Sequence, residues 1–277
     1  MFKDSLEWAV AQINKCFHLS SEVDSYMISL GGPALKFTQD VWDVAMILAS
    51  VVFAIVACYE LYAIAVRTEA RGGPMGSTEV AFKVLFKVAV CFLLIQVSFD
   101  VLVNLYKTSN AFTEAIGGIK YGTAMASDVI SWDKVSASVP DGFKSIGPFI
   151  MAMLVLIFCW AARIAAIVMI LMRLVQVYLY IAVAPVPLAT LPSQEYSQVA
   201  KSFIKSFIAV CLQGTLIYLV VRFLPAMLDT ALNTDLFNPG KESGIVARLL
   251  VAWLYSVAIL ITLVGSQQLA RRICGAM

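Results

Sequence analysis

Long apolar runs separated by shorter polar segments dominate the pattern of the chain. A helix that crosses a bilayer needs about 20 consecutive residues that are mostly apolar, and several stretches reach that length. They fall within residues 41–66, 79–106, 147–192, 193–224 and 247–277. The pattern predicts an all-α polytopic membrane protein with about five transmembrane helices. The first two form a hairpin over residues 41–106.

The longest apolar stretch, residues 147–192, contains two arginines and ends in a proline-rich element. Arg163 and Arg173 interrupt it, and Pro185 and Pro187 lie near its end. An arginine in hydrocarbon costs roughly 3 kcal/mol or more by insertion scales, so this segment should face protein, water or headgroups along part of its length. About 20 residues from Gly147 cross the bilayer. The remainder either continues as a long tilted helix or turns back.

The first 40 residues predict amphipathic helices at the membrane surface. Residues 2–17 have apolar side chains at helical spacing, with charged and amide side chains largely opposite. A second short helix over residues 23–30 ends at Gly31-Gly32-Pro33. Two interpretations remain open for this region. It either docks on the membrane or a partner, or it caps the protein's own helices.

The polar segment 107–146 is too long for a plain connection. We expect two short amphipathic helices in it, one apolar stripe containing Phe112 and Ile116, the other Met125 and Trp132. These helices either cover helix ends or face a substrate or partner. The shorter segment 225–246 is expected to be a second loop on the same side of the membrane.

One pair of opposite charges is predicted within the hairpin. Glu60 lies near the end of the first crossing, and Lys83 and Lys87 share a face near the start of the second. The antiparallel hairpin brings them to similar depth, so we expect Glu60 to pair with Lys83 or Lys87. The alternative is that each charge extends separately to the interface.

The fourth membrane helix has a polar start and a small-residue position inside it. Ser193 can cap it, because a serine oxygen accepts free amides at a helix start. Lys201 and Lys205 share a face one turn apart. Gln213-Gly214 is a candidate helix-packing pair, since small residues permit close approach and an amide can bond across the interface.

Composition removes several classes of function. The chain is 61% hydrophobic and 14% charged, whereas soluble domains have about 25% charged residues. A net charge of +2 is too small to favour a stable nucleic-acid site. The six cysteines form no CxxC, His18 is the single histidine, and no Walker A, GxSxG or HExxH motif occurs. We therefore expect neither an enzyme nor a metal or cofactor.

Basic residues indicate the orientation, because lysine and arginine mark the cytoplasmic side. Five crossings place all of the basic turns on that side at once, with the N-terminus outside and the C-terminus inside. The residues concerned are Arg67, Arg71, Lys201, Lys205, Arg271 and Arg272.

The layout resembles the TrbL-type polytopic inner-membrane subunits of type IV secretion and conjugation systems, in the compact Gram-positive form. The shared features are an amphipathic start, two crossings, a long external loop and a long third helix. An AP-x-PLA element follows, here residues 184–189, and then a lysine-bearing helix with Lys201 and Lys205 and, further along, Gln213-Gly214. The large soluble C-terminal extension of some members has no counterpart here.

The resemblance implies a structural channel subunit in the bacterial cytoplasmic membrane that assembles with copies of itself. Its partners would be membrane lipid, other secretion subunits including motor ATPases, and a DNA–protein substrate contacted transiently. The loop 107–146 would lie nearest the substrate, and the turn from Pro185 to Lys205 nearest the ATPases. A small-solute permease and a scaffold without a conduit remain the alternatives.

Overall fold

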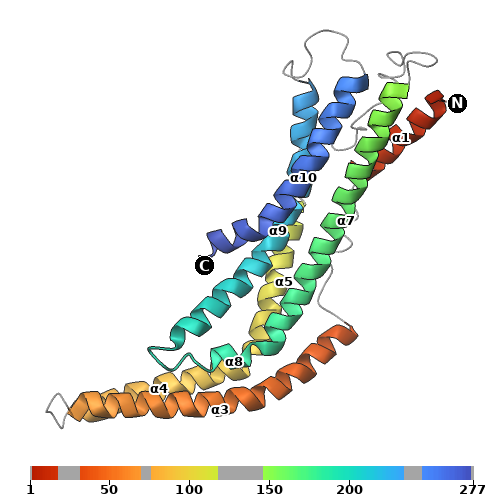
Figure 1. Cartoon of the computed structure of the whole chain (residues 1–277). Coiled ribbons are helices and arrows are strands. Elements are labelled where there is room, and N and C mark those ends of the chain that lie inside the picture. Colours follow the sequence, from red (N-terminus) through yellow and green to blue (C-terminus); the bar gives the residue numbers. More distant parts are fainter. Residues whose placement is uncertain (1, 18–31, 70–75, 118–145, 234–244, 276–277) are drawn as a thin grey trace. The chain divides into compact units, whose positions relative to one another are not determined.

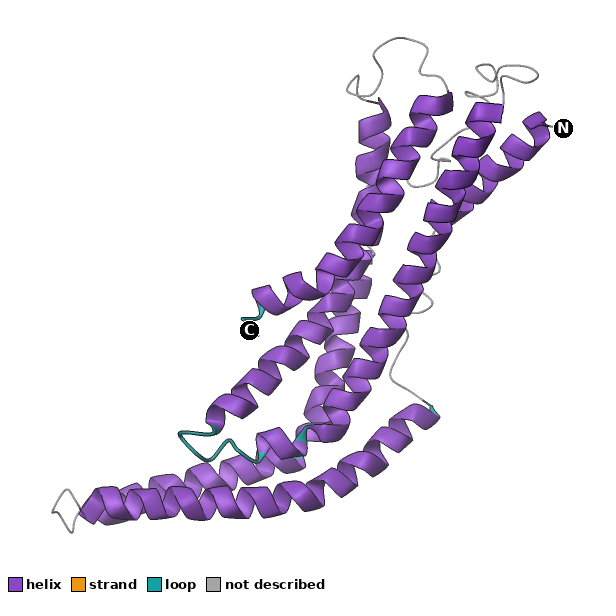
Figure 2. Cartoon of the chain, viewed as in Figure 1, coloured by secondary structure: helices purple, strands orange, loops and turns teal. Residues whose placement is uncertain are grey.

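The computed structural model describes residues 2–17, 32–69, 76–117, 146–233 and 245–275. Within these ranges the secondary structure is helical, joined by short turns (Figures 1 and 2). The elements are α1 (Phe2–Phe17), α3 (Pro33–Glu69), α4 (Gly76–Gln96), α5 (Ser98–Gly117), α7 (Ile146–Val183), α8 (Pro185–Leu188), α9 (Ser197–Asn233) and α10 (Ile245–Ile273).

The helices fit the predicted all-α polytopic membrane class. Four stretches are long and apolar enough to cross a bilayer: Pro33–Val66, Ile146–Val183, Ser197–Val221 and Ala252–Ile273. A bent pair, Phe82–Gln96 with Ser98–Ile116, makes five if it forms one span. Outward-facing apolar side chains such as Ile47 and Phe82, 69% and 70% exposed, are those that lipid would cover.

The second predicted crossing is not a straight helix. The expected helix 79–106 is divided into α4 and α5, which meet at Val97 with a bend of 61°. Ser98, just after the bend, is buried and accepts a hydrogen bond from Trp42 Nε1 at 3.3 Å. The bend therefore lies where α5 packs against α3.

The start of the polar segment, expected at residue 107, also differs from the prediction. Residues 107–117 continue α5 instead of starting a separate surface helix. Helix α5 tolerates these polar residues because it is amphipathic, with Leu102, Val103 and Tyr106 on its buried side. Met125 and Trp132 lie outside the described residues, as do the short helix expected at 23–30 and Arg71.

The long apolar stretch forms one continuous helix. Helix α7 runs for 38 residues to Val183, so the chain continues past Arg173 without turning back. Pro185 and Pro187 lie in the short helix α8, after the end of α7. Proline has no N–H to continue an α-helical ladder, which accounts for the end of α7 at this point.

Helix α9 is longer than expected. The predicted loop 225–246 was placed after Pro225, but α9 continues through Pro225 to Asn233. The prediction of a helix end at this proline was wrong. Residues 234–244 of that loop lie outside the described residues.

The chain divides into two compact units, each built from segments distant in sequence. The first contains residues 1–28, 112–172 and 213–269. Its core joins α1 to α7, α9 and α10, and Leu6, Ala9 and Ile13 of α1 are completely buried in it. This burial favours the interpretation of α1 as a cap on the protein's own helices.

The second unit contains residues 29–111, 173–212 and 270–277. Its core includes Ile95, Tyr106, Ile181 and Phe207 from four different helices. Helix α8 packs against α3 and α4 (Figure 1). This unit contains the polar contacts described next.

Candidate functional site

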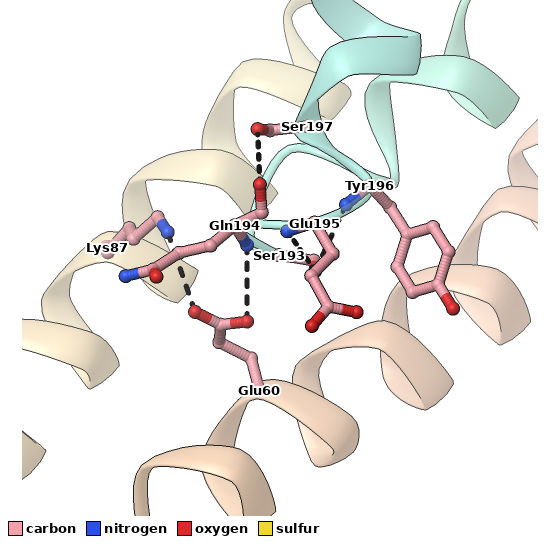
Figure 3. Close-up of polar contacts among 7 residues, drawn as sticks. All are labelled: Glu60, Lys87, Ser193, Gln194, Glu195, Tyr196 and Ser197. Carbon is pink, nitrogen blue, oxygen red and sulfur yellow. Dashed lines mark hydrogen bonds and ion pairs between the residues drawn. The ribbon is translucent and has the colours of Figure 1, made fainter. Parts of the chain in front are cut away.

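The candidate site is a group of polar contacts in the second unit, where the α3–α4 hairpin meets the turn between α8 and α9 (Figure 3). We call it the hairpin–turn clamp and define it as Tyr59, Glu60, Lys87 and residues 193–197. The hairpin supplies Tyr59, Glu60 and Lys87. The turn supplies backbone N–H groups, the hydroxyl groups of Ser193 and Ser197, and the Glu195 carboxylate.

Ser193 organises the turn. It is completely buried, and its Oγ accepts hydrogen bonds from the N–H groups of Glu195 at 3.2 Å and Tyr196 at 3.3 Å. The Ser193 carbonyl also accepts the N–H of Ser197 at 3.2 Å. These are the contacts of a capping residue, as expected from the sequence, and they hold the turn that leads directly into α9 at Ser197.

Glu60 accepts a hydrogen bond from a backbone N–H of the turn that Ser193 does not bind. Its Oε2 receives the backbone N–H of Gln194 at 3.2 Å. The first amides of a helix have no partner within it, and the helix dipole makes this end favourable for a carboxylate. Glu60 of α3 therefore binds, from another segment of the chain, the turn that leads into α9.

Lys87 lies on the other side of the same carboxylate. Its Nζ is 4.0 Å from Glu60 Oε1. The Glu60 side chain is 6% exposed and that of Lys87 is 42% exposed. A buried carboxylate needs both charge and hydrogen-bond compensation, and the Gln194 amide and Lys87 supply one each. Lys83, the other predicted candidate, is exposed on α4.

A second contact between hairpin and turn lies next to Glu60. The Tyr59 hydroxyl donates to Glu195 Oε2 at 3.3 Å. The rings of Tyr59 and Tyr196 meet edge to face with centroids 6.2 Å apart, an arrangement that aromatic pairs favour. Consecutive residues of α3 thus hold consecutive parts of the turn.

A buried arginine forms the second polar feature of this unit. Arg173 of α7 is 3% exposed and donates from Nε to the carbonyl of Val210 at 3.1 Å and from Nη2 to that of Cys211 at 3.0 Å. Its Cζ lies 5.4 Å from the ring centroid of Tyr106. The protein therefore satisfies this arginine with carbonyl groups and an aromatic face, which offsets the cost of its position in an apolar helix.

The remaining predicted residues lie apart from the clamp. Pro185 is buried in α8 and Pro187 half-buried, while Lys201 and Lys205 are exposed on α9. Gln213 and Gly214 are buried within α9, and Ile116 packs against the core of the first unit, where Phe112 is exposed. The side chain of Arg67 lies outside the described residues.

Sequence reasoning did not find the turn as the partner of Glu60, because that partner is a backbone amide. It also did not connect Arg173 to Tyr106. In the described residues, no group of three or more histidine, cysteine or acidic side chains is arranged to hold a metal. The arrangement joins helices and offers no recognisable catalytic chemistry.

Comparison with known protein families gives a match over the first part of the membrane region. A family model described as "TrbL/VirB6 plasmid conjugal transfer like protein" matches residues 34–185, which is more than half of the chain. The matched region extends from α3 to the start of α8 and contains Glu60, Lys87 and Arg173. No curated protein and no solved structure matches.

Proposed function

The chain belongs to the TrbL/VirB6 plasmid conjugal transfer-like family, and we propose that it is a channel subunit of a conjugative DNA-transfer machine. Membership of this family implies involvement in conjugal transfer or type IV secretion. In our proposal the protein lies in the cytoplasmic membrane of a bacterium. It assembles there with copies of itself and with other subunits, and it forms part of the conduit for a DNA–protein substrate.

The family match over residues 34–185 is the observation that carries this proposal. The structure adds support, because most of the described chain is apolar helix of membrane-spanning length. The polar contacts in the second unit connect helices and do not form a reaction centre. In our proposal the energy for transfer comes from partner ATPases that contact the α8–α9 turn.

The orientation follows the distribution of basic residues. We place the α8–α9 turn, the exposed Lys201 and Lys205, and Arg271 and Arg272 in the cytoplasm. The N-terminus and residues 118–145 then lie outside. On this arrangement the hairpin–turn clamp is at the cytoplasmic edge of the second unit, where a motor protein has access to it.

Cross-linking of DNA during transfer tests the conduit. A photoreactive phenylalanine analogue replaces Phe112, which is 56% exposed on α5, in cells that are transferring DNA. The matched control carries the analogue at Phe82, which is 70% exposed on apolar α4. We expect transferring DNA to be recovered with the protein from the Phe112 variant and not from the Phe82 variant.

Three results would contradict the proposal. If transfer proceeds normally in the Phe112 variant and no DNA is recovered above the Phe82 control, the chain acts as a scaffold beside the conduit. If the purified chain alone moves a small solute into liposomes, the chain is a permease. A normal transfer frequency after deletion of the gene would remove the protein from the machine altogether.

A further inference from the structure

Helix α5 has an exposed polar face beside an exposed apolar one. Asp100, Asn104, Lys107 and Thr108 are all exposed. At 3.6 residues per turn they fall within an arc of about 100°. The exposed apolar residue Leu105 lies outside this arc, on the adjoining side of the helix. The opposite side of α5 packs inside the second unit through Leu102, Val103 and Tyr106.

The depth of this polar face is set by a contact with α9. Ser109 Oγ donates to the carbonyl of Cys211 at 2.9 Å. Cys211 lies near the middle of the 25-residue apolar stretch Ser197–Val221. Lys107 is two residues before Ser109, about 3 Å along the helix axis, and Asp100 is nine residues before it, about 13 Å. The polar face therefore extends from one edge of the apolar layer to its middle.

Lipid is an unsuitable environment for these side chains. A lysine at mid-bilayer depth costs about 2.5–3.5 kcal/mol by insertion scales, and the headgroups lie about 15 Å from the bilayer centre. Within the described residues, the side chains of Asp100, Asn104 and Lys107 make no hydrogen bond or ion pair. Close by, Asn110 Oδ1 is buried without a hydrogen-bond partner among the described residues.

We propose that the exposed polar face of α5, formed by Asp100, Asn104, Lys107 and Thr108, lines a water-filled path that further copies of this chain close. This inference rests on the proposed channel function. The face has both a negative and a positive side chain on one helix, so its common chemistry is hydration and not selection for one sign of charge. Water also supplies the partners that the side chains of Asp100, Asn104 and Lys107 lack, whereas the Thr108 hydroxyl already donates to the Asn104 carbonyl at 2.9 Å.

Cysteine labelling in native membranes tests the path. Asn104→Cys and Lys107→Cys are treated with a charged, membrane-impermeant thiol reagent, with Val175→Cys as the matched control. Val175 is an exposed apolar residue of α7, two residues after Arg173, which bonds to the same Cys211 carbonyl as Ser109. Modification is measured by mass spectrometry of the peptide that contains each position, so the native cysteines do not interfere. Thr108→Cys provides a third position on the polar face if either of the first two variants fails to accumulate in the membrane.

We expect the polar-face cysteines to react at least about tenfold faster than Cys at position 175, since the thiolate needs water and burial in apolar surroundings suppresses it. Equal rates at all positions would overturn the inference. Protection of the polar face together with disulfide formation between copies would also overturn it, because that result describes a dry interface. Either failure leaves the proposed function standing, because transfer after deletion of the gene is measured separately.

Discussion

Arg173 lies over the ring of Tyr106, with its Cζ 5.4 Å from the ring centroid. The same guanidinium donates to two carbonyl groups of α9. One buried side chain thereby connects α5, α7 and α9 in the second unit. An arginine that would be unfavourable in lipid becomes a structural element when its donors are satisfied by neighbouring helices.

Replacing Arg173 tests this connection. Arg173→Lys keeps the positive charge but loses the planar fork that reaches two carbonyl groups. Hydrogen bonds from charged groups contribute about 1.5–3 kcal/mol each, so we expect a clear fall in the Tm of the detergent-purified protein. Arg271→Lys, on an exposed side chain, is the control and should change the Tm little. An Arg173→Lys protein with the Tm of wild type would refute the structural role of the guanidinium.

Exchanging the charges of Glu60 and Lys87 tests their pairing in the hairpin–turn clamp. Glu60→Lys places two cations together and removes the acceptor for the Gln194 amide, so we expect less assembled protein in the membrane. Adding Lys87→Glu should restore assembly only in part, because the exchanged pair recovers the charge contact but not that hydrogen bond. The measurement is the amount of oligomer recovered from membranes.

The single variant Glu60→Gln separates the two contacts. The amide oxygen of the new glutamine still accepts the Gln194 N–H. The lost ion pair involved the half-exposed Lys87 and contributes less than about 1 kcal/mol to stability. We therefore expect Glu60→Gln to assemble nearly as well as wild type and Glu60→Leu to assemble poorly. A double exchange no better than Glu60→Lys alone would argue against the pair, and equal behaviour of the Gln and Leu variants would argue against the amide contact.

Removal of the cap at the start of α9 should destabilise the turn. Ser193→Ala deletes the oxygen that accepts the amides of Glu195 and Tyr196, and loss of such a cap costs about 0.5–2 kcal/mol. Ser202→Ala, at an exposed position in α9, is the matched control. Thermal unfolding of the three proteins decides the matter: the prediction fails if the Ser193 and Ser202 variants unfold at the same temperature.

The prolines of α8 should control the length of α7. In the double variant Pro185→Ala and Pro187→Ala, the new N–H groups can bond to the carbonyls of Ile181 and Val183. Helix α7 then lengthens, and the α8–α9 turn moves away from α3. We expect a reduced transfer frequency in mating assays. Pro148→Ala is the control, because Pro148 lies in the first turn of α7, where its missing N–H has no partner in the helix. Normal transfer in the double variant would show that this turn is dispensable.

Much of the fold follows from the sequence because the dominant signal is the length of its apolar runs. The all-α membrane class was predictable on that basis, while helical spacing predicted the amphipathic first helix and a serine side chain predicted the cap. The bend at Val97 was not, since no proline or glycine marks it; it lies beside the hydrogen bond from Trp42 to Ser98. The continuation of α5 past residue 106 was missed because its polar face was mistaken for a surface segment.

Of the candidate site, only the pairing of two charged side chains was predictable from the sequence. Antiparallel geometry and helical spacing bring Glu60 and Lys87 to similar depth, and the structure places them 4.0 Å apart. The other half of the clamp is a backbone amide on a turn more than a hundred residues away, and no residue pattern encodes such a partner. Pro225 likewise lies within α9, although proline usually ends a helix.

A mating experiment with an in-frame deletion of the gene tests membership of the transfer machine most directly. Donor cells without the chain should lose conjugal transfer, and a plasmid copy of the wild-type gene should restore it. Unchanged transfer from the deletion strain, with the rest of the machine intact, would contradict the account.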